Sequence, residues 1–136
     1  MNREPGSAAL AGALERVRGE LERSGARVRI GFPAGCRLLM GSRVFAITLG
    51  RRIFLAPELL SQSRERIVAT LRHELVHVDQ VLRLGLIRFL AIYLRDYLRG
   101  RLAGRSHLEA YRAIPFEREA FGSEEGPVAP FGRSPV

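Results

Sequence analysis

Apolar residues recur at helical spacing near the start of the chain. Leu10, Leu14, Val17 and Leu21 lie four, three and four positions apart. This spacing places them on one face of a helix, with charged residues on the other sides. Gly25 follows the last apolar position and is expected to end the helix.

The next segment has the pattern of short strands. Arg27–Phe32 alternates polar and apolar residues, apart from Gly31, and Arg43–Leu49 is rich in β-branched and aromatic residues. Gly50-Arg51 is typical of a tight turn into a third strand, Arg52–Leu55. Because the connections are short, we expect a small antiparallel sheet of about three strands.

The second half of the chain is helical in pattern. Apolar positions at spacings of three and four predict a helix over Ser63–Leu84 and a second over Leu86–Leu102, with Gly85 between them. A shorter helix is expected after Ser106, and one or two further helical turns over Phe116–Phe121. Together with the sheet, these helices predict an α+β fold.

The length of 136 residues allows one domain. We expect it to occupy residues 1–121, because residues 122–136 are rich in Gly, Pro and Ser and lack periodicity, as in a flexible tail. Cys36 is the single cysteine, which excludes an internal disulfide and a cysteine-based zinc knuckle.

The chain is basic, with a formal net charge of +8, and all 22 basic residues are arginine. The arginines are scattered, with no run longer than Arg51-Arg52, so the charge favours anionic partners in general and gives little support to nucleic-acid binding. The longest uncharged piece of the most apolar stretch, Phe89–Leu94, is far too short to span a bilayer. We therefore expect a soluble protein, with the cytoplasm as the default location.

The segment most informative about chemistry lies within the helix expected over Ser63–Leu84. It reads His73-Glu74-Leu75-Val76-His77, an HExxH motif. Two histidines four residues apart project from one helical face and can bind one zinc ion. Glu74 lies beside the same face, where its carboxylate can act as general base on water and then return the proton to a leaving amine.

The motif supplies two metal ligands, so a third must come from elsewhere in the chain. Gln80 and Arg83 occupy the positions at which a metzincin site requires Gly and His, which excludes that type of site. The residues alone leave four candidates for the third ligand: His107, Glu109, Glu117 and Glu119.

The order of strands and helices, the sequence HELVHVDQ and the later segment Tyr111–Ala120 resemble small gluzincin-like metallopeptidases. The likeness is to the minigluzincin type and to the HExxH domains found around bacterial contractile injection systems, and it covers roughly Val28–Phe121. It implies a zincin-like fold, bound Zn²⁺ and Glu117 as third ligand, with Ala120 three residues later. Phe121 stands where those families have Asp or Asn.

The sequence thus predicts a zinc metallopeptidase with His73, His77 and Glu117 as metal ligands and Glu74 as general base. A peptide or protein substrate is expected to add as a strand to the edge of the sheet, with Arg43–Leu49 as the candidate edge. Two alternatives remain open: a zinc-binding but latent or inactive interaction module, and a basic protein that binds a membrane surface or nucleic acid.

Overall fold

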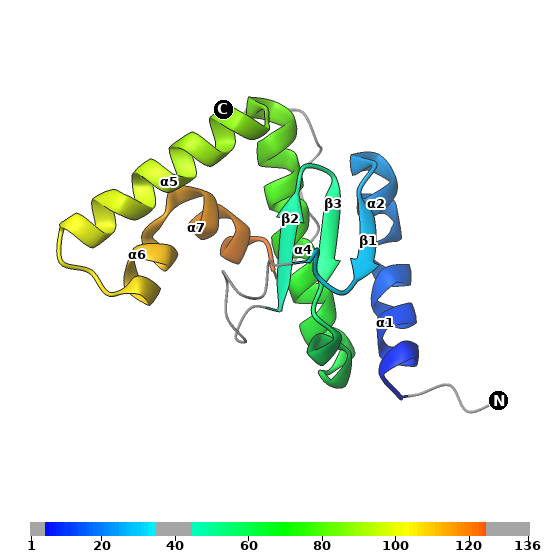
Figure 1. Cartoon of the computed structure of the whole chain (residues 1–136). Helices are drawn as coiled ribbons and strands as arrows, with labels where there is room; N and C mark the ends of the chain where they lie inside the picture. The colour runs from blue at the N-terminus through cyan, green and yellow to red at the C-terminus, as the bar shows by residue number, and fades with distance from the viewer. Residues whose placement is uncertain (1–4, 35–44, 125–136) are drawn as a thin grey trace.

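The computed structural model describes residues 5–34 and 45–124, and Figure 1 shows their arrangement. The fold is α+β, with six α-helices, one 3-10 helix and a three-stranded sheet in the described residues. The elements are α1 (Pro5–Arg16), α2 (Arg18–Ser24), β1 (Arg27–Ile30), β2 (Ala46–Leu49), β3 (Arg52–Leu55), η1 (Pro57–Ser61), α4 (Arg64–Leu84), α5 (Leu86–Leu102), α6 (His107–Ala113) and α7 (Pro115–Gly122).

The sheet is mixed, which corrects the prediction of an antiparallel sheet. β2 and β3 form the expected antiparallel hairpin, with Thr48 opposite Ile53, but β1 pairs with β3 in parallel, with Val28 opposite Ile53. The strand order is β1-β3-β2. A short connection implies antiparallel pairing only for strands that are neighbours in both the sequence and the sheet. The chain between β1 and β3 includes the whole of β2, so these two strands can pair in parallel.

Several boundaries differ from the sequence prediction, among them the start of β2 at Ala46. The first apolar helix is divided at Val17, which separates α1 from α2. β1 ends at Ile30 because Gly31 has a φ of 95°. The part of the expected strand at residues 43–44 and the tail beyond residue 124 lie outside the described residues, as does Cys36.

Helix α4 is the central element of the fold. Its side chains Ile67, Leu71 and Leu75 are fully buried in the core, which also contains Ile53 and Leu55 from β3. The sheet and α1 pack on α4, and α7 packs on it at another side (Figure 1). The HExxH motif therefore lies on a helix that is held from several directions.

Gly85 lies between α4 and α5, where its φ of 83° and ψ of 151° suit glycine far better than other residues. From this bend α5 runs away from the sheet, and α6 and α7 return along it to α4 (Figure 1). Gly100 allows α5 and α6 to approach closely, since a Cβ at that position would lie 3.0 Å from the Cβ of Ala110.

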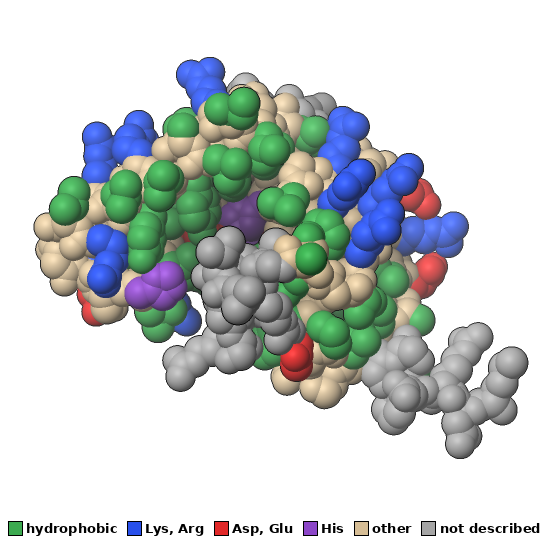
Figure 2. Space-filling view, viewed as in Figure 1, with side chains coloured by type: hydrophobic (Ala, Val, Ile, Leu, Met, Phe, Trp, Pro, Cys, Tyr) green, Lys and Arg blue, Asp and Glu red, His purple; other side chains and the backbone are tan. Residues whose placement is uncertain are grey.

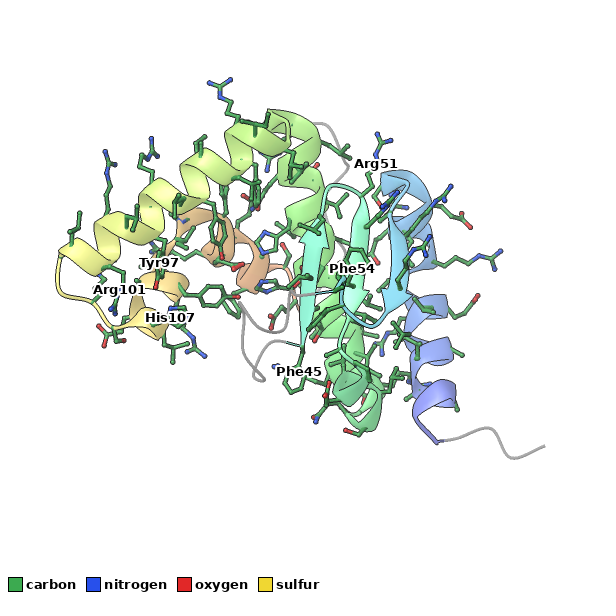
Figure 3. All side chains as sticks on the ribbon, viewed as in Figure 1. Phe45, Arg51, Phe54, Tyr97, Arg101 and His107 are labelled. Carbon is green, nitrogen blue, oxygen red and sulfur yellow. The ribbon has the colours of Figure 1, made fainter. Side chains whose placement is uncertain are left out.

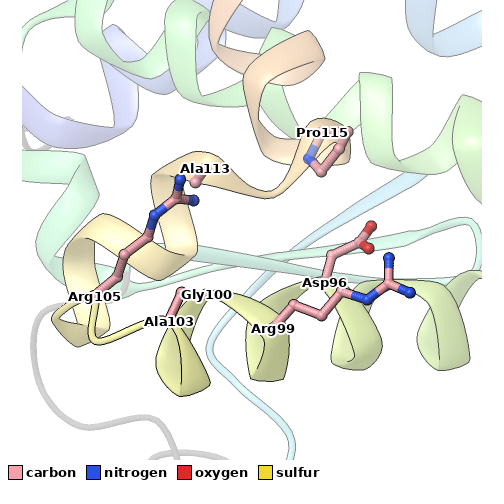
Figure 4. A pocket seen from close by; sticks show the side chains of 7 residues that line it. All are labelled: Asp96, Arg99, Gly100, Ala103, Arg105, Ala113 and Pro115. Carbon is pink, nitrogen blue, oxygen red and sulfur yellow. The ribbon is translucent and has the colours of Figure 1, made fainter.

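A pocket of about 270 Å³ lies where α5 meets the α6–α7 return. Figure 4 shows Asp96 and Arg99 toward one end of it and Arg105 toward the other, with Gly100 between.

Candidate metal centre

Three side chains that could hold a metal ion come together between α4 and α7. His73 and His77 project from α4, and Glu117 projects from the first turn of α7. All three residues are buried, and one ligand atom from each lies within 4.8 Å of the others. The helical spacing of the histidines and the return of the chain through α5 and α6 bring these residues into one cluster.

The Nε2 atoms of both histidines converge on the Glu117 carboxylate. His73 Nε2 lies 3.0 Å from Glu117 Oε1, and His77 Nε2 is in still closer contact with the same oxygen. The two imidazole rings meet edge to face, with 5.0 Å between their centroids. Two nitrogens and one carboxylate oxygen therefore face a common point.

The remaining ring nitrogens are held by other side chains. His77 Nδ1 lies 2.8 Å from Gln80 Oε1, and His73 Nδ1 lies 3.0 Å from Glu124 Oε1. When each Nδ1 carries the proton, it donates to that oxygen and leaves Nε2 free to bind a metal. Such partners fix the tautomer and orientation of metal-binding histidines.

Sequence reasoning did not assign either of these partners that role. Gln80 is fully buried, and its amide nitrogen donates to the carbonyl oxygen of Phe116 at 3.0 Å, so it is fixed at both ends. Its position three residues after His77, on the same helix face, was the available signal. Glu124 lies in the segment expected to be a flexible tail and carried no signal. Phe121, in the Asp or Asn position, instead packs its ring on His73 with centroids 4.6 Å apart.

The electrostatics of the cluster stabilise a carboxylate beside positive charge. Burial disfavours the charged form of His77, but its hydrogen bond to Glu117 and nearby carboxylates outweigh that effect and raise its pKa to about 9. The pKa of His73 is raised by the same balance. Burial acts to raise the pKa of Glu117, but the two histidines lower it to about 2. At neutral pH Glu117 is thus an anion and His77 is protonated, so a metal that binds this cluster would displace the proton from His77 Nε2.

Two tyrosines lie against the other side of Glu117. The Tyr93 hydroxyl donates to Glu117 Oε2 at 3.3 Å. Burial raises the pKa of both Tyr93 and Tyr111, and the Glu117 carboxylate raises each further. Both phenols therefore keep their protons and remain hydrogen-bond donors near the cluster.

Glu74 is buried next to the cluster and is bound to the sheet. The Thr48 hydroxyl on β2 donates to Glu74 Oε2 at 2.6 Å. Glu74 is absent from the group of converging ligand atoms, although its charge acts on both His73 and His77. The carboxylate is therefore close enough to influence the histidines while being held by the edge strand β2.

The other candidates for third ligand lie outside the cluster. His107 is exposed on α6 and makes a 2.8 Å hydrogen bond with the Tyr97 hydroxyl, far along α5 from α4 (Figure 3). Glu109 is also exposed on α6. Glu119 is exposed and binds Arg83 at 3.1 Å and the Gln80 amide at 3.3 Å, so it supports a histidine's partner without reaching the histidines.

We predict that Gln80→Leu weakens metal binding about 10–100-fold, because it preserves volume but removes the oxygen that orients His77. Titration of the purified variant with a metal-sensitive dye would measure the change. Leu82→Gln, an exposed change on the same helix, is the control and should leave the affinity unaltered. Equal affinity of the Gln80 variant and the parent would contradict this positioning role.

Figure 2 shows a histidine side chain recessed in a depression on the visible face, next to hydrophobic side chains that lie over α5. His73 and His77 are 6% and 8% exposed, respectively, so the cluster is largely shielded but touches solvent. In the described residues, no helix is long and apolar enough to cross a membrane.

Comparison with known proteins gives one family assignment. The model of the eCIS core domain family matches residues 10–84, which extend from α1 to the end of α4 and include the whole HExxH motif. Glu117 and Glu124 lie beyond the matched region. No curated protein and no solved structure gives a significant match.

The match covers more than half of the chain and agrees with the predicted link to contractile injection systems. This chain therefore belongs to the eCIS core domain family.

Proposed function

We propose that this protein is a zinc-dependent peptidase that hydrolyses peptide bonds with Glu74 as general base. The observation that carries the proposal is the convergence of His73 Nε2, His77 Nε2 and the Glu117 carboxylate beside a separately anchored Glu74. The HExxH sequence alone predicts two ligands and a base, and the position of the Glu117 carboxylate beside both histidines supports it as the third ligand.

The donor set fits zinc. Two imidazole nitrogens and one carboxylate oxygen form a recurrent protein ligand set of catalytic zinc, with a fourth position open to water or substrate. Tetrahedral bonds of about 2.0–2.1 Å separate ligand atoms by roughly 3.3 Å, so the present spacing requires only small side-chain shifts. Zinc bound there would supply a Lewis acid that lowers the pKa of water and polarises a peptide carbonyl.

Glu74 would move the proton. Its carboxylate would accept a proton from the attacking water and deliver it to the amine that leaves when the peptide bond breaks. The hydroxyl of Thr48 occupies Glu74 Oε2 at 2.6 Å, which restricts the rotation of the carboxylate and leaves Oε1 for the reaction.

Tyr93 and Tyr111 could assist as neutral donors. A phenol that keeps its proton can hydrogen-bond to the negative oxygen that develops on the substrate carbonyl. Their position around Glu117 fits that role better than that of Tyr97, which binds His107 away from the cluster.

Strand β2 is the proposed docking edge for substrate. Within residues 5–34 and 45–124, β2 pairs with β3 on one side and has no strand on the other, and its Thr48 touches the proposed general base. An extended peptide added along β2 would therefore pass Glu74. We further propose, from the family assignment, that the natural substrate or partner is a protein of a contractile injection assembly.

The function is tested with the full chain and an unfolded protein substrate, casein. We expect elemental analysis to find about one zinc per chain in protein purified without chelator. We also expect casein cleavage to stop when a chelator removes the metal and to return when zinc is restored.

Absence of bound transition metal, even after zinc is supplied, would reject the metal centre. Stoichiometric zinc without cleavage of casein or of injection-system proteins would instead favour the zinc-binding interaction module.

A further inference from the structure

Helix α5 exposes a long row of apolar side chains. Ile87, Leu90, Leu94, Leu98 and Leu102 recur at spacings of three and four and are 85%, 49%, 56%, 47% and 88% exposed. This spacing places them on one side of the helix, and Figure 2 shows hydrophobic side chains following α5 along the molecule. We call these five residues the α5 apolar row.

The row is not needed to hold α5 in place. A different side of the helix packs on α4 and α6, where Phe89 and Gly100 are buried and Tyr93 reaches Glu117. Polar residues in the row would leave those contacts intact. A continuous exposed apolar surface of this length marks an interaction site more often than a random surface feature.

Arginines lie along one edge of the row. Arg88, Arg95 and Arg99 are separated by seven and four residues, which aligns them next to the apolar side chains. Arg101 adds a fourth positive charge, and the one acidic residue of α5, Asp96, is paired with Arg95 at 3.1 Å. The helix is therefore amphipathic and basic.

We propose that α5 docks this protein onto an anionic lipid surface, with the α5 apolar row in the headgroup–acyl boundary and the arginines against lipid phosphates. A basic helix with one apolar side lies in the plane of a membrane in this way, and long arginine side chains reach the headgroups while their stems cover apolar surface. The 17 residues of α5 would give a contact about 25 Å long.

The shape and charge of α5 favour a lipid surface over a protein as the partner of the α5 apolar row. The row lies on α5, which runs along the outside of the molecule (Figure 1), and a lipid surface can accept a projecting row of side chains without a matching groove. A second copy of the chain would bring two arginine rows together, within molecules that each carry a net charge of +8. The proposal goes beyond peptide hydrolysis and does not depend on zinc or on Glu74.

The test is flotation of the full chain with phosphatidylcholine vesicles and with vesicles that also contain phosphatidylglycerol. We expect binding to the anionic vesicles that weakens as salt increases. Leu94→Gln combined with Leu98→Gln should reduce the affinity at least tenfold, and Arg88→Gln combined with Arg99→Gln should reduce it and flatten the salt dependence.

Matched variants control for general effects. Ile30→Gln with Leu49→Gln removes two comparably exposed apolar side chains from the sheet, and Arg23→Gln with Arg118→Gln removes two exposed charges elsewhere. Both controls should retain most of the binding. Ile87→Gln with Leu102→Gln changes the two most exposed members of the row and serves if the first leucine pair fails to fold.

Three results would overturn the proposal: no binding to anionic vesicles, equal binding to both kinds of vesicle, or unchanged binding of the α5 leucine variants. A fourth result would also overturn it: the parent sediments as a dimer, the α5 leucine variants sediment as monomers, and vesicle binding is the same for both. The α5 apolar row would then be assigned to self-association.

Discussion

Glu117→Gln should weaken zinc affinity by more than about 100-fold, whereas Glu119→Gln should leave it nearly unchanged. Replacing a residue that only orients a metal ligand typically lowers metal affinity about 10–100-fold. Glu117 is proposed to bind the metal directly, so its replacement should cost more. The Glu117 carboxylate faces both Nε2 atoms, while that of Glu119 binds Arg83 at 3.1 Å. Competition with a chelating dye would measure both affinities.

The variants Glu117→Gln and Glu119→Gln make the same change in size and charge. A difference in their zinc affinities therefore separates a direct ligand from a nearby acidic residue. A melting curve for each variant would check that the fold is retained. A strong loss with Glu119→Gln and none with Glu117→Gln would move the ligand by two residues. A loss seen only with His107→Ala would require an all-histidine site, which the exposed position of His107 argues against.

The helices are the part of the fold that the sequence predicts well. α4 and α5 have long apolar faces with glycine between them, so local periodicity defines both, and the structure confirms Arg64–Leu84 and Leu86–Leu102. The direction of β1 could not be obtained in the same way. Its pairing with β3 depends on contacts between distant segments, which alternation within Arg27–Ile30 does not encode.

The candidate metal centre likewise combines residues that a local sequence pattern identifies with a residue that is distant in the sequence. The HExxH spacing identifies His73, Glu74 and His77 because one helix turn holds all three. Glu117 is predicted only through the resemblance, since 40 residues separate it from His77.

The partners that orient these groups depend on the assembled fold. Thr48 comes from the edge strand and Glu124 lies two residues after the end of α7, and neither contact follows from a local sequence pattern. Gln80 is the exception: it lies within one turn of His77, but the sequence did not show that its amide would be fully buried.

The second large effect is expected from Glu74→Gln, which should retain zinc within a few-fold of the parent affinity while losing peptide hydrolysis. Glu74 does not converge with the three ligand atoms, so the metal centre should survive its replacement. An amide cannot accept the proton of the attacking water, and loss of a general base typically costs about 10²–10⁴-fold in rate. Glu65→Gln, an exposed change at the start of α4, is the matched control and should keep full activity.

The measurement combines zinc content with casein cleavage on the same preparations, because the two readouts separate ligand from base. If Glu74→Gln loses zinc as well as activity, Glu74 has a structural part in the metal centre. If the variant cleaves as fast as the parent, Glu74 is not the base and the cleavage comes from another group or from a contaminating protease. In the parent, Glu74 is held on β2 by Thr48 independently of the histidines. We therefore expect the Glu74→Gln variant to keep its zinc and to lose cleavage.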